Sequence, residues 1–146
     1  MKKTLTLAAV LLLAVPVIAS AQGFSDLDSG MQAISSGFGR GESRAVVSGM
    51  AAGDKVMLQF PGLIDESGFF GRDQAALLLD KLFQKAKPAG FQQSSARKNS
   101  AEGQYIITGT WTIQPSGSPE ARELYVTLHQ NSNGSWSLVS VRSAGK

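Results

Sequence analysis

The sequence comprises 146 residues with a formal net charge of +3, one histidine and no cysteine. The lack of cysteine excludes thiol catalysis, thiolate metal sites and disulfides, and His129 alone cannot form the usual two- or three-histidine metal site. No loop carries the spaced acidic residues of a calcium site. The basic residues are scattered, which argues against a nucleic-acid-binding surface. We therefore expect no metal, no cofactor and no nucleic-acid partner.

The first 21 residues have the pattern of a secretory signal peptide. Lysines occupy positions 2 and 3, an apolar stretch runs from Leu5 to Ile18, and Ala19-Ser20-Ala21 provides a cleavage site. A membrane anchor is the alternative, but the stretch is shorter than the about 20 residues that span a bilayer. We therefore predict cleavage before Gln22 and a periplasmic or secreted product that is not membrane-bound. Since no cysteine can carry a lipid, we do not expect a lipoprotein.

Removing 21 of the 146 residues leaves 125, which is enough for one domain with a single apolar core, over residues 22–146. The two lysines of the signal are lost and the 11 acidic residues stay, so the net charge falls from +3 to about +1. The mature protein is thus predicted to be nearly neutral.

The N-terminal part of the mature chain has helical spacing. Apolar residues recur at three- and four-residue steps from Phe24 to Phe38, which predicts a helix with one apolar face. Ser25, followed three residues later by Asp28, is an N-cap pattern, and glycines at positions 37, 39 and 41 predict the end of the helix. A second, short helix is predicted over residues 42–50.

A strand, a very short strand and the longest helix follow. Alternation over residues 56–60 predicts a strand that ends at Pro61, and Phe69-Phe70 predicts a second, very short one. An apolar stripe from Ala75 to Ala86 predicts an amphipathic helix, which Pro88 and Gly90 end.

Four antiparallel strands are predicted after Gly90. The first, over residues 91–98, is mostly polar, whereas residues 105–113 and 124–129 alternate cleanly between apolar and polar side chains. Asn133-Gly134 predicts a tight hairpin turn. The return strand, residues 135–142, shifts its alternation, which indicates a bulge or burial on both faces.

Helices that are separate from a run of antiparallel strands indicate an α+β fold, in which a curved sheet wraps the long helix. The element order is similar to that of the nuclear-transport-factor-2-like cone, also called cystatin-like or SnoaL-like. More narrowly, the chain resembles the exported bacterial proteins of domain-of-unknown-function family 4783. The segments that carry this resemblance are KVMLQFPG at 55–62, GRDQA at 71–75 with LDKLF at 79–83, YVTL at 125–128 and WSLV at 136–139.

The resemblance covers residues 26–142. It implies a cone in which N-terminal helices and one long helix pack on a curved antiparallel sheet, and it implies export. It implies no activity. Enzymes of the wider superfold place acidic residues inside an apolar pocket, where burial shifts the carboxyl pKa. In this sequence the acidic residues fall in predicted turns, helix surfaces and strand ends, which argues against that chemistry.

Tyr125 and His129 form the sharpest candidate constellation, because they lie four residues apart on one strand and therefore share a face. They form either a pocket pair or part of an exposed sheet face opposite the apolar residues of the strand, and we favour the second interpretation. Trp111 and Trp136 are candidates for lining a ligand pocket, although large aromatic residues more often belong to the core.

We therefore predict a non-enzymatic domain that binds a small ligand or a protein partner through a cone-shaped pocket or a sheet face. Its candidate ligand-binding residues are Tyr125, His129, Trp111 and Trp136, and no catalytic residue is assigned. The alternative is a small isomerase- or hydrolase-like enzyme that uses Tyr125, His129 and a nearby acid. A homodimer through the exposed sheet face is a third possibility.

Overall fold

A computed structural model of the chain describes residues 23–145. The predicted signal peptide and its cleavage site lie outside the described residues. The order of elements agrees with that predicted from the sequence. The elements are α1 (Leu27–Arg40), α2 (Ser43–Val47), β1 (Lys55–Gln59), β2 (Gly68–Gly71), α3 (Arg72–Ala86), β3 (Pro88–Asn99), β4 (Gln104–Ile113), β5 (Glu120–Gln130) and β6 (Trp136–Ser143).

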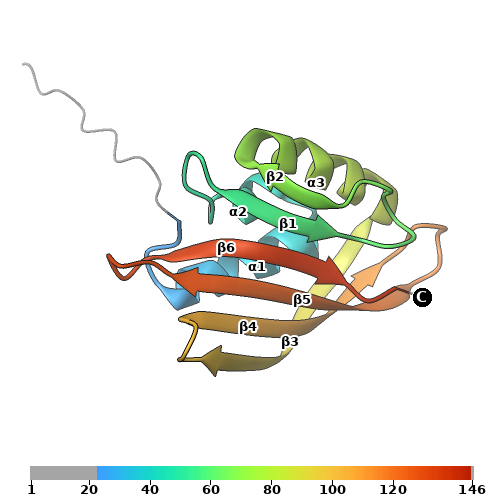
Figure 1. Cartoon of the computed structure of the whole chain (residues 1–146). Helices are drawn as coiled ribbons and strands as arrows, with labels where there is room; N and C mark the ends of the chain where they lie inside the picture. Colours follow the sequence, from blue (N-terminus) through green and yellow to red (C-terminus); the bar gives the residue numbers. More distant parts are fainter. Residues whose placement is uncertain (1–22, 146) are drawn as a thin grey trace, which may run out of the picture.

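The strands form one curved six-stranded sheet in the order β2-β1-β6-β5-β4-β3, and the helices cover one of its faces (Figure 1). This arrangement confirms the predicted α+β class. One pair departs from the antiparallel expectation, because β1 runs parallel to β6 and all other neighbours are antiparallel. Among residues 23–145, no helix combines the length and apolar character needed to cross a bilayer.

Helix α1 begins one residue later than the sequence pattern suggested. Its N-cap is Asp26, whose carboxylate accepts a hydrogen bond of 2.7 Å from the Ser29 backbone N–H. That backbone N–H stabilises the charged form and lowers the pKa of Asp26 below its ordinary value. The helix also continues past Gly37, and its C-cap is Gly41 at φ 72°. At Gly37, a Cβ would overlap the Val46 side chain, so this glycine allows α1 and α2 to approach closely.

The bulge predicted in β6 is present. The register of β6 against β5 shifts between Thr127 and Leu128, which leaves Val139 without a direct partner. Leu138 and Val141 therefore both point to the inner face of the sheet and are buried, although they are three residues apart.

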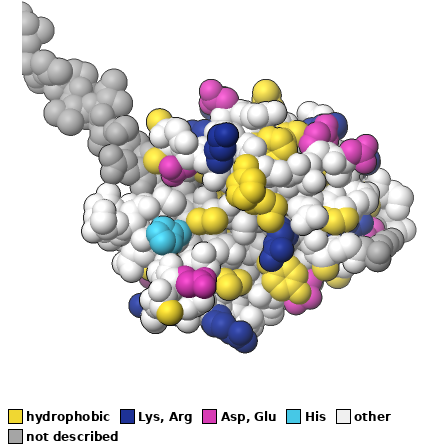
Figure 2. Space-filling view, viewed as in Figure 1, with side chains coloured by type: hydrophobic (Ala, Val, Ile, Leu, Met, Phe, Trp, Pro, Cys, Tyr) yellow, Lys and Arg dark blue, Asp and Glu magenta, His cyan; other side chains and the backbone are white. Residues whose placement is uncertain are grey.

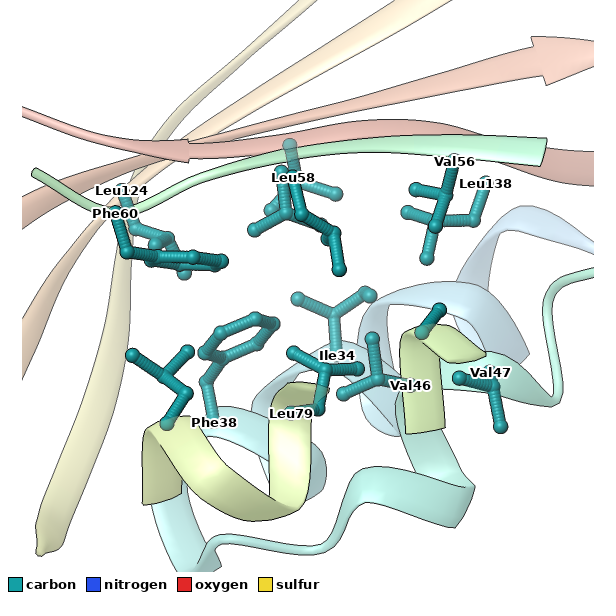
Figure 3. Close-up of a cluster of buried hydrophobic side chains, with 14 of the residues drawn as sticks. Ile34, Phe38, Val46, Val47, Val56, Leu58, Phe60, Leu79, Leu124 and Leu138 are labelled. Carbon is teal, nitrogen blue, oxygen red and sulfur yellow. The ribbon is translucent and has the colours of Figure 1, made fainter. Parts of the chain in front are cut away.

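The core lies between the inner face of the sheet and the three helices. Figure 3 shows side chains from both layers pointing toward one another, among them Ile34 and Phe38 of α1, Leu58 of β1 and Leu124 of β5. The segment before α1 joins this core through Phe24, which exchanges backbone hydrogen bonds of 2.7 and 2.8 Å with Trp136 and is 5% exposed. The core thus includes a residue that lies only three positions after Ala21.

Candidate functional site

Trp111 lies at the centre of a buried aromatic cluster rather than on the wall of an open pocket. Its ring makes edge-to-face contacts with Phe38, Phe60 and Phe83, at centroid distances of 5.4, 6.1 and 6.3 Å. Its indole N–H donates a 2.8 Å hydrogen bond to the carbonyl of Phe38 in the last turn of α1. That carbonyl is one of the helix-end acceptors that α1 cannot satisfy internally, so Trp111 joins the sheet to the helix.

The aromatic cluster fills the part of the cone where β4 faces α1 and α3. Trp111 and Phe38 have no exposed surface, and Phe60 and Phe83 are 1% and 6% exposed. A ligand there would have to displace packed side chains, because protein interiors have the density of organic crystals.

Trp136 lies at the other end of the core, at the start of β6. It is 7% exposed, and its ring contacts that of Tyr105 at 6.1 Å in an edge-to-face geometry. Its backbone pairs with Phe24. Trp111 and Trp136 therefore belong to different parts of the core and do not line one common pocket.

Tyr125 lies on the outer face of the sheet, on the side away from the helices. In the register it is opposite Arg142, and both line a shallow hollow of about 220 Å³ together with Gln59 and Ser143. A hydrogen bond to the Glu123 carboxylate raises the pKa of Tyr125 above its ordinary value, and the Arg142 charge opposes that shift. This hollow lies on the sheet surface and is lined by polar residues whose exposed atoms are largely apolar.

His129 shares the outer face with Tyr125 but lies further along β5 and is exposed (Figure 2, cyan). A strand rises about 3.3 Å per residue, so four residues separate the two backbones by about 13 Å. The structure therefore places both residues on one face, as the alternation indicated. It does not bring them within hydrogen-bonding distance of each other.

The inner face of β5 ends in a buried charge. Leu124, Val126 and Leu128 point into the core, and the preceding inward position is Arg122, which is 8% exposed. Arg122 is also the register partner of Trp111 on β4, so the charge lies beside the aromatic cluster. Its Nε donates to the Glu120 carboxylate at 2.8 Å, and its Nη1 donates to the Pro61 carbonyl at 2.6 Å.

Arg122 faces a pocket, which we call the Arg122 pocket. The end of β1, the start of β5 and the last turn of α3 meet here, at one end of the molecule (Figure 1). The pocket has a volume of about 390 Å³ and is lined by Pro61, Gly62, Leu63, Lys85, Pro115, Glu120, Arg122 and Gly145.

Gly62 lies next to the guanidinium in the Arg122 pocket. Its φ of 76° is in the left-handed region that favours glycine, and a Cβ at this position would be 3.7 Å from Nη2 of Arg122. A larger residue at this position would therefore place its side chain against the guanidinium. Since the Arg122 pocket combines a buried cation with an open volume, it is the strongest candidate site in the described part of the chain.

A second hollow, of about 580 Å³, lies between α2 and α3. Ser43 is buried there, and its hydroxyl donates to the carboxylate of Asp80 at 2.5 Å. Arg44 and Arg72 line the hollow together with Asp73 and Asp80, so the charges alternate and do not select a ligand of one sign. Within residues 23–145, no three histidine, aspartate or glutamate side chains gather closely enough to hold a metal ion.

Arg122 was not among the residues predicted for a site, although the sequence carries a signal for it. Extending the alternation of Leu128, Val126 and Leu124 by two more residues places Arg122 on the apolar face. The sequence interpretation considered charge on the apolar strand faces for the acidic residues only. A cation at an inward position was therefore overlooked.

Comparison with known families and structures confirms the resemblance drawn from the sequence. The family described as "Domain of unknown function (DUF4783)" matches residues 31–142. No curated protein matches the chain.

Solved structures show the same fold. A DUF4783 family protein from Bacteroides ovatus superposes with a TM-score of 0.63 at 22% identity, covering 78% of this chain and 92% of that one. One from Bacteroides fragilis gives 0.61 at 20% identity, covering 78% and 95%. An NTF-2-like protein of unknown function from Shewanella oneidensis gives 0.58 at 14% identity, covering 82% and 98%. The expected nuclear-transport-factor-2-like fold is thus confirmed.

Proposed function

The chain belongs to the DUF4783 family and has a nuclear-transport-factor-2-like fold, and on this premise we propose that it is an exported domain that binds a ligand without catalysis. The ligand binds at the Arg122 pocket, where the end of β1, the start of β5 and the last turn of α3 meet. The observation that carries this proposal is the buried guanidinium of Arg122 facing an open pocket of about 390 Å³. Small-molecule sites are concave, with a few polar groups placed among apolar walls.

Two features support export. Residues 1–21 have the charge, apolar stretch and cleavage pattern of a signal peptide. The core also includes Phe24, which lies just after the predicted cleavage point, so cleavage before Gln22 preserves its backbone pairing with Trp136. Mass spectrometry of the protein expressed in a bacterial host with its own leader should find a mature N-terminus at Gln22. A full-length N-terminus in every cell fraction would contradict export.

The enzymatic alternative has less support. It needs Tyr125, His129 and an acid to converge on a substrate, but His129 is exposed and about 13 Å of strand separates it from Tyr125. Glu123 does contact Tyr125, yet this contact raises the pKa of the phenol. A tyrosine that loses its proton less readily is a poorer general base near neutral pH.

A fragment screen by two-dimensional ¹H–¹⁵N NMR tests the binding proposal. The library should contain anionic, cationic and neutral fragments, so that it assumes no ligand class. We expect the largest amide shift changes at Gly62, Leu63 and Gly145, which border the Arg122 pocket. Hits that instead cluster around Tyr125 on the outer face, or no hits at the Arg122 pocket, would overturn the proposal.

The outer sheet face supports a second candidate, the association of two copies of this chain. Phe69 of β2 is 69% exposed, lies opposite Met57 in the register and shares its outward direction. The same row continues over Ser140 of β6 and Thr127 of β5, which are polar, to Ile106 of β4. Figure 2 shows apolar side chains among charged ones on this face. Large exposed apolar side chains surrounded by polar and charged ones are typical of protein contacts.

Light scattering over a range of concentrations tests this association. We expect a dimer for the wild type and a monomer for Phe69→Glu, with Leu77→Glu as the matched control, since Leu77 is equally exposed but lies on α3. A wild-type monomer at the highest concentration would eliminate the sheet-face dimer.

A further inference from the structure

We propose that the Arg122 pocket binds a carboxylate attached to an apolar group, such as an aromatic acid or the free C-terminus of a peptide. This inference rests on the proposed binding function and specifies its ligand class. Four features of the pocket support it: the free donors of the guanidinium, the charge balance, the burial of Arg122 and the apolar walls.

Arg122 retains hydrogen-bonding capacity that the protein itself does not use. A guanidinium has five N–H donors in a planar fork. In the described structure Nε is engaged by Glu120 and one N–H of Nη1 by Pro61. These two contacts fix the orientation of the group. Among the described residues no hydrogen bond engages Nη2, and Gly62, the residue next to it, carries no side chain. A planar carboxylate matches such a fork better than a spherical anion does.

The lining of the pocket carries a net positive charge. Arg122 and Lys85 contribute two positive charges to the lining of the pocket, and Glu120 contributes one negative charge. Glu120 is already engaged by the guanidinium at Nε, so its charge is partly compensated within the pocket. The pocket therefore favours an anion, and Lys85 at its margin adds to the attraction without restricting the geometry.

Arg122 occupies an inward position on the sheet that would ordinarily hold an apolar residue. It continues the apolar row of Leu124 and Val126, and an apolar side chain there would satisfy the packing of the sheet, with the donor to the Pro61 carbonyl as the loss. A buried ion pair seldom adds stability relative to well-packed apolar groups, so stability alone does not account for an arginine at this point. Burial instead strengthens the attraction between the guanidinium and an anionic ligand, because the surroundings are less polarisable than water.

The walls of the pocket suit an apolar group attached to the carboxylate. Pro61, Leu63 and Pro115 provide apolar surface in the pocket. Its volume of about 390 Å³ is within the range of small-molecule sites. A carboxylate held by Arg122 would therefore place an attached ring or aliphatic side chain against these residues.

The test is an NMR titration of the mature protein with benzoate, and benzamide serves as its neutral, isosteric control. We expect saturable benzoate binding in the millimolar range, with the Nε–H resonance of Arg122 and the amides of Gly62 and Leu63 shifting together. Benzamide should bind at least about tenfold more weakly, since a charge-assisted hydrogen bond is replaced by a neutral one. Equal affinity for both compounds would overturn the carboxylate assignment.

Three variants assign the effect to residues. Arg122→Lys keeps the charge but loses the fork, and we expect at least about a tenfold loss of benzoate affinity. Lys85→Glu should weaken binding several-fold without affecting the fold, because Lys85 is an exposed side chain. Lys55→Glu is the matched control, since it makes the same charge change at the opposite end of β1 and should leave the affinity within about twofold. Equal losses for the two glutamate variants would indicate long-range charge effects only and contradict the site.

Peptides distinguish the two sources of the carboxylate. Acetyl-Ala-Ala-Phe with a free C-terminus is compared with its C-terminal amide, and inorganic phosphate serves as the non-planar anion. Tighter binding of the free peptide than of benzoate points to a protein C-terminus as the ligand, and the reverse points to a small acid. Preference for phosphate over both would overturn the proposal.

Failure of this inference is distinguishable from failure of the proposed function. If benzoate and the free peptide do not bind, but cationic or neutral fragments shift Gly62 and Leu63, the carboxylate class is wrong and the binding pocket stands. If no fragment of any charge shifts these residues, both proposals fail.

Discussion

Trp111 and Arg122 are register partners on neighbouring strands and both point to the inner face of the sheet, yet their surroundings are opposite in character. Trp111 is enclosed by three phenylalanine rings, and its single polar atom is satisfied by the Phe38 carbonyl. Arg122 is held by two acceptors and faces a pocket. The change from a dry, filled interior to a charged hollow thus takes place across one pair of residues.

The difference indicates how this cone divides stability and recognition. The aromatic cluster fills the interior next to α1 and α3, and its apolar burial and close packing stabilise the folded state. The buried charge of the Arg122 pocket adds little to the stability of the fold, because the desolvation of Arg122 offsets much of its attraction to Glu120. We therefore expect substitutions in the two regions to separate, with stability lost at Trp111 and binding lost at Arg122.

The largest effect is expected for Trp111→Ala. The substitution removes a fully buried indole and leaves the Phe38 carbonyl without its donor. We expect the free energy of unfolding to fall by about 3–5 kcal/mol, measured by urea denaturation. Trp111→Phe keeps a ring and should cost less. A fall below about 1 kcal/mol for Trp111→Ala would mean that the interior is not packed as described.

A smaller effect on stability is expected for Arg122→Met, which has a similar length and no charge. The Pro61 carbonyl loses its donor, and we expect a loss of about 1–3 kcal/mol in the free energy of unfolding. Benzoate binding should be abolished while the protein stays folded. A stability loss equal to that of Trp111→Ala, together with unchanged binding, would make Arg122 a purely structural residue.

The smallest effect is expected for His129→Ala. His129 is exposed on the outer face, remote from both the aromatic cluster and the Arg122 pocket. The free energy of unfolding should change by no more than about 0.5 kcal/mol, and the benzoate affinity should stay the same. A marked loss of binding in this variant would revive the candidate pair of Tyr125 and His129.

Most of the fold could be predicted because the apolar periodicity is strong in each element. The stripe from Ala75 to Ala86 and the alternation over 105–113 each allow only one type of element. The parallel pairing of β1 with β6 could not be predicted, since it joins segments about 80 residues apart and leaves no local pattern. The glycines of α1 were misjudged for the same reason, because Gly37 is required by its contact with α2.

The candidate site was less predictable than the fold. Its walls come from the turn after β1, the end of α3, the β4–β5 connection and the last residues of the chain, which no sequence motif brings together. Aromatic residues were the natural candidates for a pocket, yet Trp111 is buried in the core. The residue that carries the site could be located only by extending the period of β5 to Arg122 and accepting a charge on the apolar face.

Diffraction from crystals soaked with 4-bromobenzoate tests most directly whether a carboxylate ligand binds in the Arg122 pocket. The anomalous signal of bromine locates the ligand without reference to any assumed pose. We predict a bromine peak in the Arg122 pocket, beside Pro61 and Pro115, with the carboxylate on the guanidinium of Arg122. A bromine peak among Phe38, Phe83 and Trp111, or on the outer face at Tyr125, would contradict the account.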